Sequence, residues 1–223
     1  MRDLHQGPHH PARRRILQTV GGLALLAGLG SLARPASARA VPANLTPQDE
    51  ADINRIEDYL NGITTMQAKF QQYSAKGGIA FGNIYLKRPG FIRIEYEPPS
   101  PMLIVSDSVS LHYYDPQLDQ INRVPVSSSP IWFLLKDSVH LGDDVTVTAF
   151  NRAPNAFEIT IRQTSDAESG KVVLELGDRP LELRQWSVVD NKDQEVRVGL
   201  FDAQFGMELD QELFRVPRKR TGN

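Results

Sequence analysis

The 223-residue sequence contains no cysteine. This absence excludes disulfide bonds, thiol chemistry and any zinc site built on cysteine ligands. It also excludes lipid attachment to this chain, since a bacterial lipoprotein needs an acceptor cysteine after its signal. Whatever holds the fold together must therefore come from packing, hydrogen bonds and ion pairs alone.

Histidine is scarce where catalysis or metal binding would need it. Beyond residue 40 the chain holds only His112 and His140, and their spacing does not match a metal-binding pair. No G-x-S-x-G nucleophile motif and no phosphate-binding glycine loop occurs. Glu95 and Glu97 could form a glycosidase carboxylate pair, but they are more typical of a solvated outer strand face. We therefore expect no enzyme, no cofactor and no metal, with His112 as a plain surface or rim residue.

The small formal charge of −2 hides an uneven distribution. Residues 1–40 hold six of the 25 basic groups and one of the 27 acidic groups, so the remainder carries 19 basic and 26 acidic groups, a net charge of −7. A domain this acidic is a poor ligand for nucleic acid and for anionic lipid headgroups. We expect no nucleic-acid partner.

The first 40 residues have the pattern of an export signal. Arg13-Arg14-Arg15 precedes an uncharged stretch over residues 16–32, and small residues at 36–40 offer cleavage sites, with the cut after Ala40 preferred. A single membrane anchor is the alternative, but 17 residues with four glycines are short for a span. The arginines fit either the general or the twin-arginine export route. We predict a cleavable signal over residues 1–40 and one domain over residues 41–223.

One amphipathic helix is predicted at the start of that domain. Thr46 fits an N-cap, Pro47 a first helical turn, and Asn61-Gly62 a stop. Apolar residues recur between them at helical spacing: Ile53, Ile56, Leu60 and Ile63. Such a stripe most often covers a core.

From Thr65 onward the apolar period changes to two, which predicts strands. After a first strand from residue 65, we expect strands at about 79–88, 91–97, 102–106, 109–115, 118–124, 144–150, 156–163, 171–177, 181–190 and 194–205. Turn residues separate them, and connections this short leave no room for crossover helices, so the sheet should be antiparallel. About eleven strands in one sheet must curl strongly or close.

Two segments interrupt or follow these strands. Residues 129–136 predict a short helix capped by Ser129, whose first turn is wholly apolar. Its side chains either plug the core or point into a hollow or toward a partner. We expect residues 210–216 to cover a sheet edge.

The stretch of residues 82–107 carries the most information about function. Alternation places five apolar residues on one face of two adjacent strands: Ile84, Leu86, Ile92, Ile94 and Tyr96. Arg88 continues the row of the first strand. A guanidinium among apolar neighbours is costly unless it is paired, so Arg88 is either a barrel-rim residue whose charge reaches water or a functional latch.

The ordered motifs of this stretch resemble the LolA family of periplasmic carriers, which ferry lipoproteins to the outer membrane. They are Lys87-Arg88-Pro89, the strand ending in Tyr96, the proline-rich break at residues 98–101, and Leu103-Ile104-Val105-Ser106-Asp107. Tyr113-Tyr114-Asp115-Pro116 and Ser129-Pro130 follow in the same order. The similarity runs from about Ile53 to Pro217.

The resemblance implies a mainly β fold, an unclosed antiparallel barrel of about eleven strands covered by a lid of short helices. In this family the strands and the lid enclose a cavity for acyl chains, which matches Ile84, Leu86, Ile92, Ile94, Tyr96, Trp132, Phe133 and Leu135 here. The lid helix would carry Ile53, Ile56, Leu60 and Ile63. Arg88 corresponds to the arginine that holds the lid. It would donate to carbonyls at the end of the first helix or of the helix near Leu135.

The resemblance also implies partners and a compartment. The cargo would be acylated lipoproteins, received in the periplasm from the inner-membrane ABC transporter LolCDE and passed by a monomeric carrier to the outer-membrane receptor LolB. The missing cysteine distinguishes a soluble carrier from a lipid-anchored receptor of related fold. A periplasmic lipid-sensing or regulatory module on the same fold is the alternative, although a second domain would be expected there. A hydrolase would need a cluster of polar catalytic groups.

Overall fold

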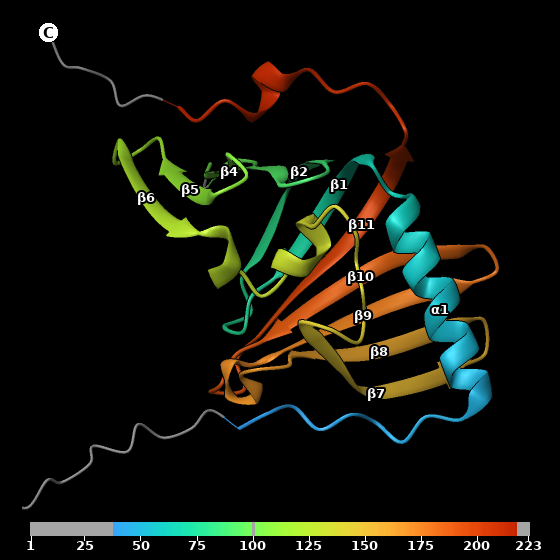
Figure 1. The fold of residues 1–223 in the computed structure, drawn as a ribbon. Coiled ribbons are helices and arrows are strands. Elements are labelled where there is room, and N and C mark those ends of the chain that lie inside the picture. Colours follow the sequence, from blue (N-terminus) through green and yellow to red (C-terminus); the bar gives the residue numbers. More distant parts are fainter. Residues whose placement is uncertain (1–37, 100, 218–223) are drawn as a thin grey trace, which may run out of the picture. The chain divides into compact units, whose positions relative to one another are not determined.

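The computed structural model describes residues 38–99 and 101–217, and its main feature is one eleven-stranded antiparallel sheet (Figure 1). The strands are β1 (Thr65–Tyr73), β2 (Ile79–Lys87), β3 (Phe91–Tyr96), β4 (Leu103–Ser106), β5 (Ser110–Asp115), β6 (Gln120–Pro125), β7 (Val145–Ala153), β8 (Ala156–Gln163), β9 (Lys171–Asp178), β10 (Leu181–Val189) and β11 (Glu195–Phe205). Their number and order agree with the sequence-based expectation, because turn residues mark nearly every break.

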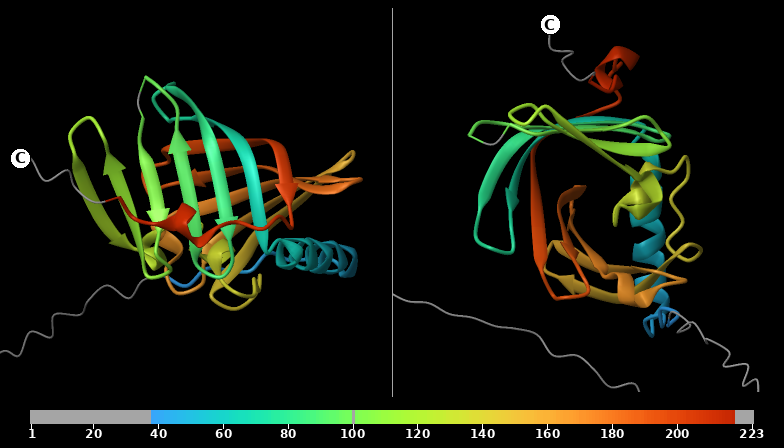
Figure 2. Two further views of the ribbon diagram at one scale, coloured as in Figure 1. Left: turned by 90° about the horizontal axis from the view of Figure 1, so that it is seen from above. Right: turned by 90° about the vertical axis from the view of Figure 1, so that its left-hand side faces the viewer.

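The strand order shows how the sheet remains open. It runs β6-β5-β4-β3-β2-β1-β11-β10-β9-β8-β7, so β1 pairs with β11 in the middle, and β6 and β7 form the two edges. The prediction of an unclosed barrel is thereby confirmed. Because β6 and β7 are consecutive in the chain, residues 126–144 between them have to cross the open side of the sheet (Figure 2).

Helix α1 (Pro47–Gly62) begins and ends where the sequence predicts. The Thr46 hydroxyl accepts a hydrogen bond from the backbone N–H of Asp49 at 3.2 Å, and the Asp49 carboxylate accepts one from the backbone N–H of Thr46 at 3.0 Å. This reciprocal capping box satisfies two N–H groups at the start of the helix. The predicted stripe is buried against the concave face of the sheet: Ile53, Ile56, Leu60 and Ile63.

The short helix in the crossing segment is smaller than predicted. It is a single 3-10 turn, η2 (Trp132–Leu135), and the Ser129 side chain does not cap it. Backbone hydrogen bonds between residues three positions apart define it instead. Trp132 N donates to Ser129 O at 3.0 Å, and Leu134 N donates to Ile131 O at 3.0 Å. The expected Ser129 cap is therefore wrong, and the hydroxyl of this serine remains available to the interior.

Inward side chains of neighbouring strands align in rows across the sheet. The register places Ile84, Ile94, Ile104 and Tyr113 side by side on β2 to β5. Farther along the same strands, Gly82 permits a close approach. A Cβ at this position would lie 2.7 Å from the Phe70 ring and 2.0 Å from a backbone oxygen of β3. The missing side chain thus lets the Phe70 ring lie within the concave face.

A smaller apolar cluster covers the convex face of β2 to β4. Leu209 and Phe214 are buried there against Val105, and the short helix η4 (Gln211–Phe214) packs beside β3. Lys87 Nζ donates to Leu209 O at 2.9 Å. The prediction that residues 210–216 cover a sheet edge is therefore wrong. The outward side chains of these strands are apolar too, and the C-terminal segment removes them from water.

The predicted signal over residues 1–40 lies mostly outside the described residues. Its last residues are described, and Ala40 N donates to Thr164 O at 3.1 Å. Within residues 38–99 and 101–217, no helix has both the length and the apolar character that a membrane crossing requires.

A buried carboxylate fastens α1 to the β7–β10 part of the sheet. Asp52 is only 4% exposed, and its carboxylate lies 2.6 Å from Arg152 on β7 and 2.8 Å from Arg55. Arg55 also reaches Asp178 at the end of β9, at 3.1 Å. Burial alone would raise the pKa of Asp52, but hydrogen bonds from Arg152 and Arg55 outweigh burial and lower it.

We predict that Asp52→Asn lowers the free energy of unfolding by about 1–2 kcal/mol, because charged hydrogen bonds are lost while both arginines are about half exposed. A carboxylate with a lowered folded-state pKa stabilises fully above its unfolded pKa, about 3.9, and loses that effect as the pH falls through its folded pKa. The difference between wild type and variant, measured by urea unfolding, should therefore shrink below about pH 4.

The matched control is Asp202→Asn, which breaks the exposed pair with Lys69 at 3.0 Å. This change should leave stability nearly unaltered. Equal effects of the two substitutions would contradict the assigned role of Asp52.

Candidate functional site

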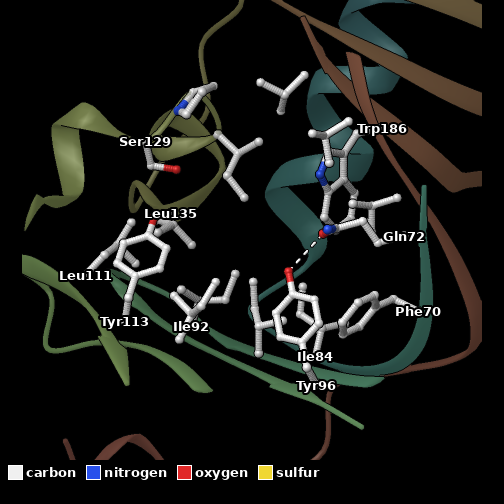
Figure 3. Close-up of a pocket in the computed structure, with 17 residues that line it drawn as sticks. Phe70, Gln72, Ile84, Ile92, Tyr96, Leu111, Tyr113, Ser129, Leu135 and Trp186 are labelled. Carbon is white, nitrogen blue, oxygen red and sulfur yellow. Dashed lines mark hydrogen bonds between the residues drawn. The ribbon is translucent and has the colours of Figure 1, made fainter. Parts of the chain in front are cut away.

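A cavity of about 160 Å³ lies between the concave face of the sheet and the crossing segment (Figure 3). Most of its lining is apolar. From β1 to β5 it is lined by Phe70, Gln72, Ile84, Ile92, Ile94, Tyr96, Ile104, Leu111 and Tyr113; from the crossing segment by Ser129, Pro130, Ile131 and Leu135; and from β10 and β11 by Trp186, Val188, Val196 and Val198.

A second hollow of about 40 Å³ adjoins the first on the side of α1. The two share five lining residues: Ile84, Ile92, Ile131, Leu135 and Trp186. Leu60 and Ile63 of the α1 stripe and Leu86 line this smaller space, together with Arg88. Arg88 therefore lies at the end of a continuous apolar interior.

The Arg88 guanidinium joins both helices to the sheet. Its Nη1 donates to Leu60 O in the last turn of α1 at 2.7 Å, and its Nε donates to Leu134 O of η2 at 2.7 Å. The sequence left the choice between the two helices open, and the structure uses carbonyls of both. Close by, Gly90 N donates to Leu135 O at 2.8 Å, which adds a backbone contact to η2.

The charge of Arg88 is compensated by dipoles rather than by a bonded carboxylate. Among the described residues, no ion pair includes Arg88, although Asp137 is near enough to favour its charge. Burial lowers the pKa of Arg88 to about 10, so it stays protonated at neutral pH. The last turn of α1 contains no basic residue, and Arg88 supplies the cation that a helix C-terminus favours.

Other hydrogen bonds tie α1 to the crossing segment. The Asn61 side chain donates to Val139 O at 3.0 Å and accepts from Val139 N at 2.7 Å. The Glu57 carboxylate accepts from Leu141 N at 2.8 Å. The helix and the segment thus form one layer over the cavity, and Arg88 connects this layer to β2.

One polar pair lies inside the cavity. The Tyr96 hydroxyl donates to Gln72 Oε1 at 2.8 Å, and its ring meets the Phe70 ring edge-on, with centroids 5.1 Å apart. Burial, together with the nearby Tyr113, raises the pKa of Tyr96 to about 12, so the hydroxyl stays neutral. It donates to Gln72 as a neutral hydroxyl.

The predicted lining residues fall into two groups. Ile84, Ile92, Ile94, Tyr96 and Leu135 line the main cavity, and Leu86 lines the smaller hollow. Trp132 and Phe133 instead line a separate hollow of about 200 Å³ toward β7, β8 and β9. A single helical turn cannot aim four consecutive side chains at the same space, and Ile131 takes the expected place of these two aromatics.

Sequence reasoning missed the contribution of β10 and β11 to this site. Trp186 and Val198 reach it because β11 pairs with β1, a contact between distant parts of the chain that alternation does not reveal. The sequence did indicate the position of Gln72, because this residue continues the inward-facing row of Met66, Ala68 and Phe70 on β1. His112, expected as a surface or rim residue, is buried, and its Nε2 lies 2.9 Å from Asp107 Oδ2.

The arrangement suits binding of an apolar ligand. Burial of apolar surface is the favourable term that this lining offers. In the part of the chain that the structure describes, no three His, Asp or Glu side chains gather to hold a metal ion.

Comparison with known proteins identifies related chains. A family model described as outer membrane lipoprotein carrier protein LolA matches residues 61–217. An uncharacterised protein of Rickettsia prowazekii (strain Madrid E) is 25% identical over 130 residues, covering 58% of this chain and 61% of that protein, less than two thirds of its length. The outer-membrane lipoprotein carrier protein of Pseudomonas aeruginosa (strain UCBPP-PA14) is 24% identical over 189 residues, covering 80% and 89%.

Among solved structures, a LolA superfamily protein from Nitrosomonas europaea is similar, with a TM-score of 0.43 at 9% identity. The similarity covers 73% of this chain and 97% of that one.

We predict that Arg88→Leu loosens the layer over the cavity by about 1–2 kcal/mol, because the loss of two charged hydrogen bonds outweighs the relief of burying the charge. Hydrogen–deuterium exchange should accelerate about tenfold in residues 131–141 and in the last turn of α1. Exchange in β8 to β10 should stay unchanged.

The control is Arg93→Leu, because Arg93 Nη1 also donates to a backbone carbonyl, Leu213 O at 2.9 Å, but on the convex face. It should accelerate exchange only near residues 207–215. Unchanged protection of residues 131–141 in Arg88→Leu would show that Arg88 does not hold the layer closed.

Proposed function

Because this chain belongs to the LolA family of outer membrane lipoprotein carrier proteins, we propose that it carries lipoproteins by holding their acyl chains in the apolar cavity. The observation that carries this proposal is the way the cavity is covered. The Arg88 side chain binds carbonyls of both helices over the cavity without a carboxylate partner. The family is one of carriers, and we assign this chain no enzymatic reaction.

The free energy for binding comes from removing acyl chains from water. Each buried methylene contributes roughly 0.8 kcal/mol, so a chain of about fifteen methylenes gains on the order of 10 kcal/mol. Two hydrogen bonds to a charged group contribute roughly 1.5–3 kcal/mol each. Cargo therefore gains enough on entry to displace the Arg88 contacts.

The closed cavity is too small for this cargo. At about 160 Å³ it is close to the roughly 150 Å³ cavity that accommodates a benzene molecule in another protein. Ligands the size of a drug molecule occupy roughly 300–1,000 Å³. Loading therefore requires the covering layer to move away from the sheet.

The contacts that hold the two sides of α1 differ, and this difference suggests which side opens. Asp52 holds α1 to Arg152 on β7 through a buried carboxylate, whereas Arg88 holds the same helix to β2 through a carbonyl alone. The Arg88 side is the one that opens in this proposal, because Arg88 lines the apolar interior that entering chains would fill, whereas Asp52 and Arg152 do not. In this proposal Arg88 is the latch. Entering chains displace it, and its return to Leu60 O and Leu134 O favours release.

The direction of transport is part of the proposal. The chain would be exported by the signal over residues 1–40 and act in the periplasm as a monomer. It would receive lipoproteins from a LolCDE-type inner-membrane transporter and deliver them to a LolB-type outer-membrane receptor where one is present. The net negative charge of residues 41–223 would disfavour adhesion to anionic membranes between these steps.

We predict that the protein isolated from the periplasm of an expressing bacterium retains acylated lipoprotein, because buried chains leave slowly. Native mass spectrometry should detect the complex, and mild denaturation should release an acylated polypeptide. Protein purified without acyl cargo, even when lipoproteins are overproduced, would overturn the proposed function.

We also predict that Arg88→Leu binds lipoprotein but releases it to acceptor membranes at least about fivefold more slowly, since re-formation of the latch no longer favours release. The assay follows a labelled lipoprotein from the carrier to outer-membrane vesicles. Arg93→Leu, which alters only the convex face, should release at the wild-type rate. Equal rates for all three proteins would remove Arg88 from the release step.

A further inference from the structure

Trp186 carries a hydrogen-bond donor that no protein group uses. The side chain is only 5% exposed, and an indole N–H can only donate. Within residues 38–99 and 101–217, it has no acceptor. In the same residues, every side-chain nitrogen or oxygen that is completely buried has a hydrogen-bond partner. Because the indole nitrogen has none, it is not completely buried and must border open space. That space is the cavity, which the ring lines (Figure 3).

A second donor group lies on the same face. Gln72 pairs with Val198 on β11, and Val198 pairs with Trp186 on β10, so Gln72 and Trp186 are two strands apart on the inward side. This corresponds to roughly 10 Å between their backbones. The Tyr96 hydroxyl donates to the Gln72 side-chain oxygen at 2.8 Å, and this hydrogen bond fixes the Gln72 side chain. The amide N–H₂ of Gln72 is left to donate into the cavity.

Gln72 lies far from Arg88. Gln72 pairs with Ala80 at one end of β2, whereas Arg88 follows the other end, eight residues away. Eight residues of strand span roughly 27 Å. The interior between them is lined almost entirely by apolar side chains. Gln72 therefore marks the end of the interior away from Arg88, whereas Trp186 lines both the main cavity and the hollow beside Arg88.

The chemistry of the donors selects a ligand class. Both groups are neutral and donate, so they require an acceptor. A carboxylate or phosphate bound to Gln72 would be buried among apolar side chains, roughly 27 Å along β2 from the Arg88 guanidinium, and such burial is costly. A neutral carbonyl oxygen accepts hydrogen bonds without that penalty. In a lipid, such an oxygen occurs in the ester linkage between glycerol and the fatty chain.

We propose that Trp186 and Gln72 form a donor pair that binds the ester carbonyl oxygens of the acyl cargo, with Tyr96 as the residue that positions Gln72. The pair fixes the ester end of the cargo, and the methylene chains extend from it toward Arg88. This inference rests on the proposed carrier function and adds to it the recognition of the ester linkage.

The test uses two probes of equal chain length, dipalmitoylglycerol with ester linkages and dihexadecylglycerol with ether linkages. The sequence has two tryptophans, so an NMR spectrum of ¹⁵N-labelled protein shows two indole N–H signals. The signal that disappears in Trp132→Phe belongs to Trp132, and the other belongs to Trp186. Both probes should bind by chain burial. Only the ester should shift the Trp186 indole proton downfield, and it should bind roughly three- to tenfold more tightly than the ether. Trp132, which lines a different hollow, serves as the internal reference.

Variants separate recognition of the ester from packing. Trp186→Phe and Gln72→Met remove donors while keeping apolar volume, so each should reduce the ester preference and leave ether binding intact. Gln71→Met is the matched control, because Gln71 lies on the opposite face of β1 and should preserve the preference. If Trp186→Phe does not fold, Gln72→Met and the wild-type indole shift still decide the question.

The outcomes distinguish the two proposals. Failure of both probes to bind would overturn the carrier function itself. Equal affinity for ester and ether, with an unmoved Trp186 signal, would overturn the donor pair and leave the carrier function standing.

Discussion

The Arg88 guanidinium is charged and lies among apolar side chains, so its charge has to be stabilised by hydrogen bonds. The way the cavity is covered depends on which groups accept these hydrogen bonds. Two backbone carbonyls from different helices accept its hydrogen bonds, and among the described residues no carboxylate forms an ion pair with it. Carbonyl dipoles stabilise the cation at close range without a full opposite charge to hold it. The result is a specific contact that two helices share.

Topology explains why a single residue can have this effect. The sheet stays open between β6 and β7, and the chain itself crosses that opening, so the cover is part of the connection between two strands. Helix α1 adds to this cover and is fastened to β7 by the buried pair of Asp52 and Arg152. The two sides of α1 are thus held by different kinds of contact, an ion pair on one side and hydrogen bonds to backbone carbonyls on the other.

Much of the fold could be read from the sequence because its signals are local. Thr46 and Gly62 mark the ends of α1, alternation marks the strands, and the row of Leu86 and Arg88 places the guanidinium on the apolar face. The unpredicted features depend on contacts between distant segments. Alternation says that Trp186 faces inward or outward but not that β11 brings it near Gln72.

The same limit applies to the crossing segment and the C-terminal segment. The apolar run at residues 131–135 predicts a helix but not the direction of each side chain, and the sequence alone does not indicate that Trp132 lines a different hollow from Leu135. Residues 210–216 carry apolar side chains that need a surface. Only the three-dimensional arrangement shows that β2 to β4 provide it on their convex side.

The junction of β1 with β11 also shapes how the chain assembles. Lys69 and Asp202 face each other across it although they are 133 positions apart, whereas strands β1 to β6 and strands β7 to β11 each form by successive hairpins. Local hairpins form quickly, and distant pairing is slow because a large loop has to close first. The two meanders should therefore fold early and join last. Until they join, the unpaired edges of β1 and β11 are the surfaces most exposed to aggregation, which makes this junction the step where a folding helper would have most to protect.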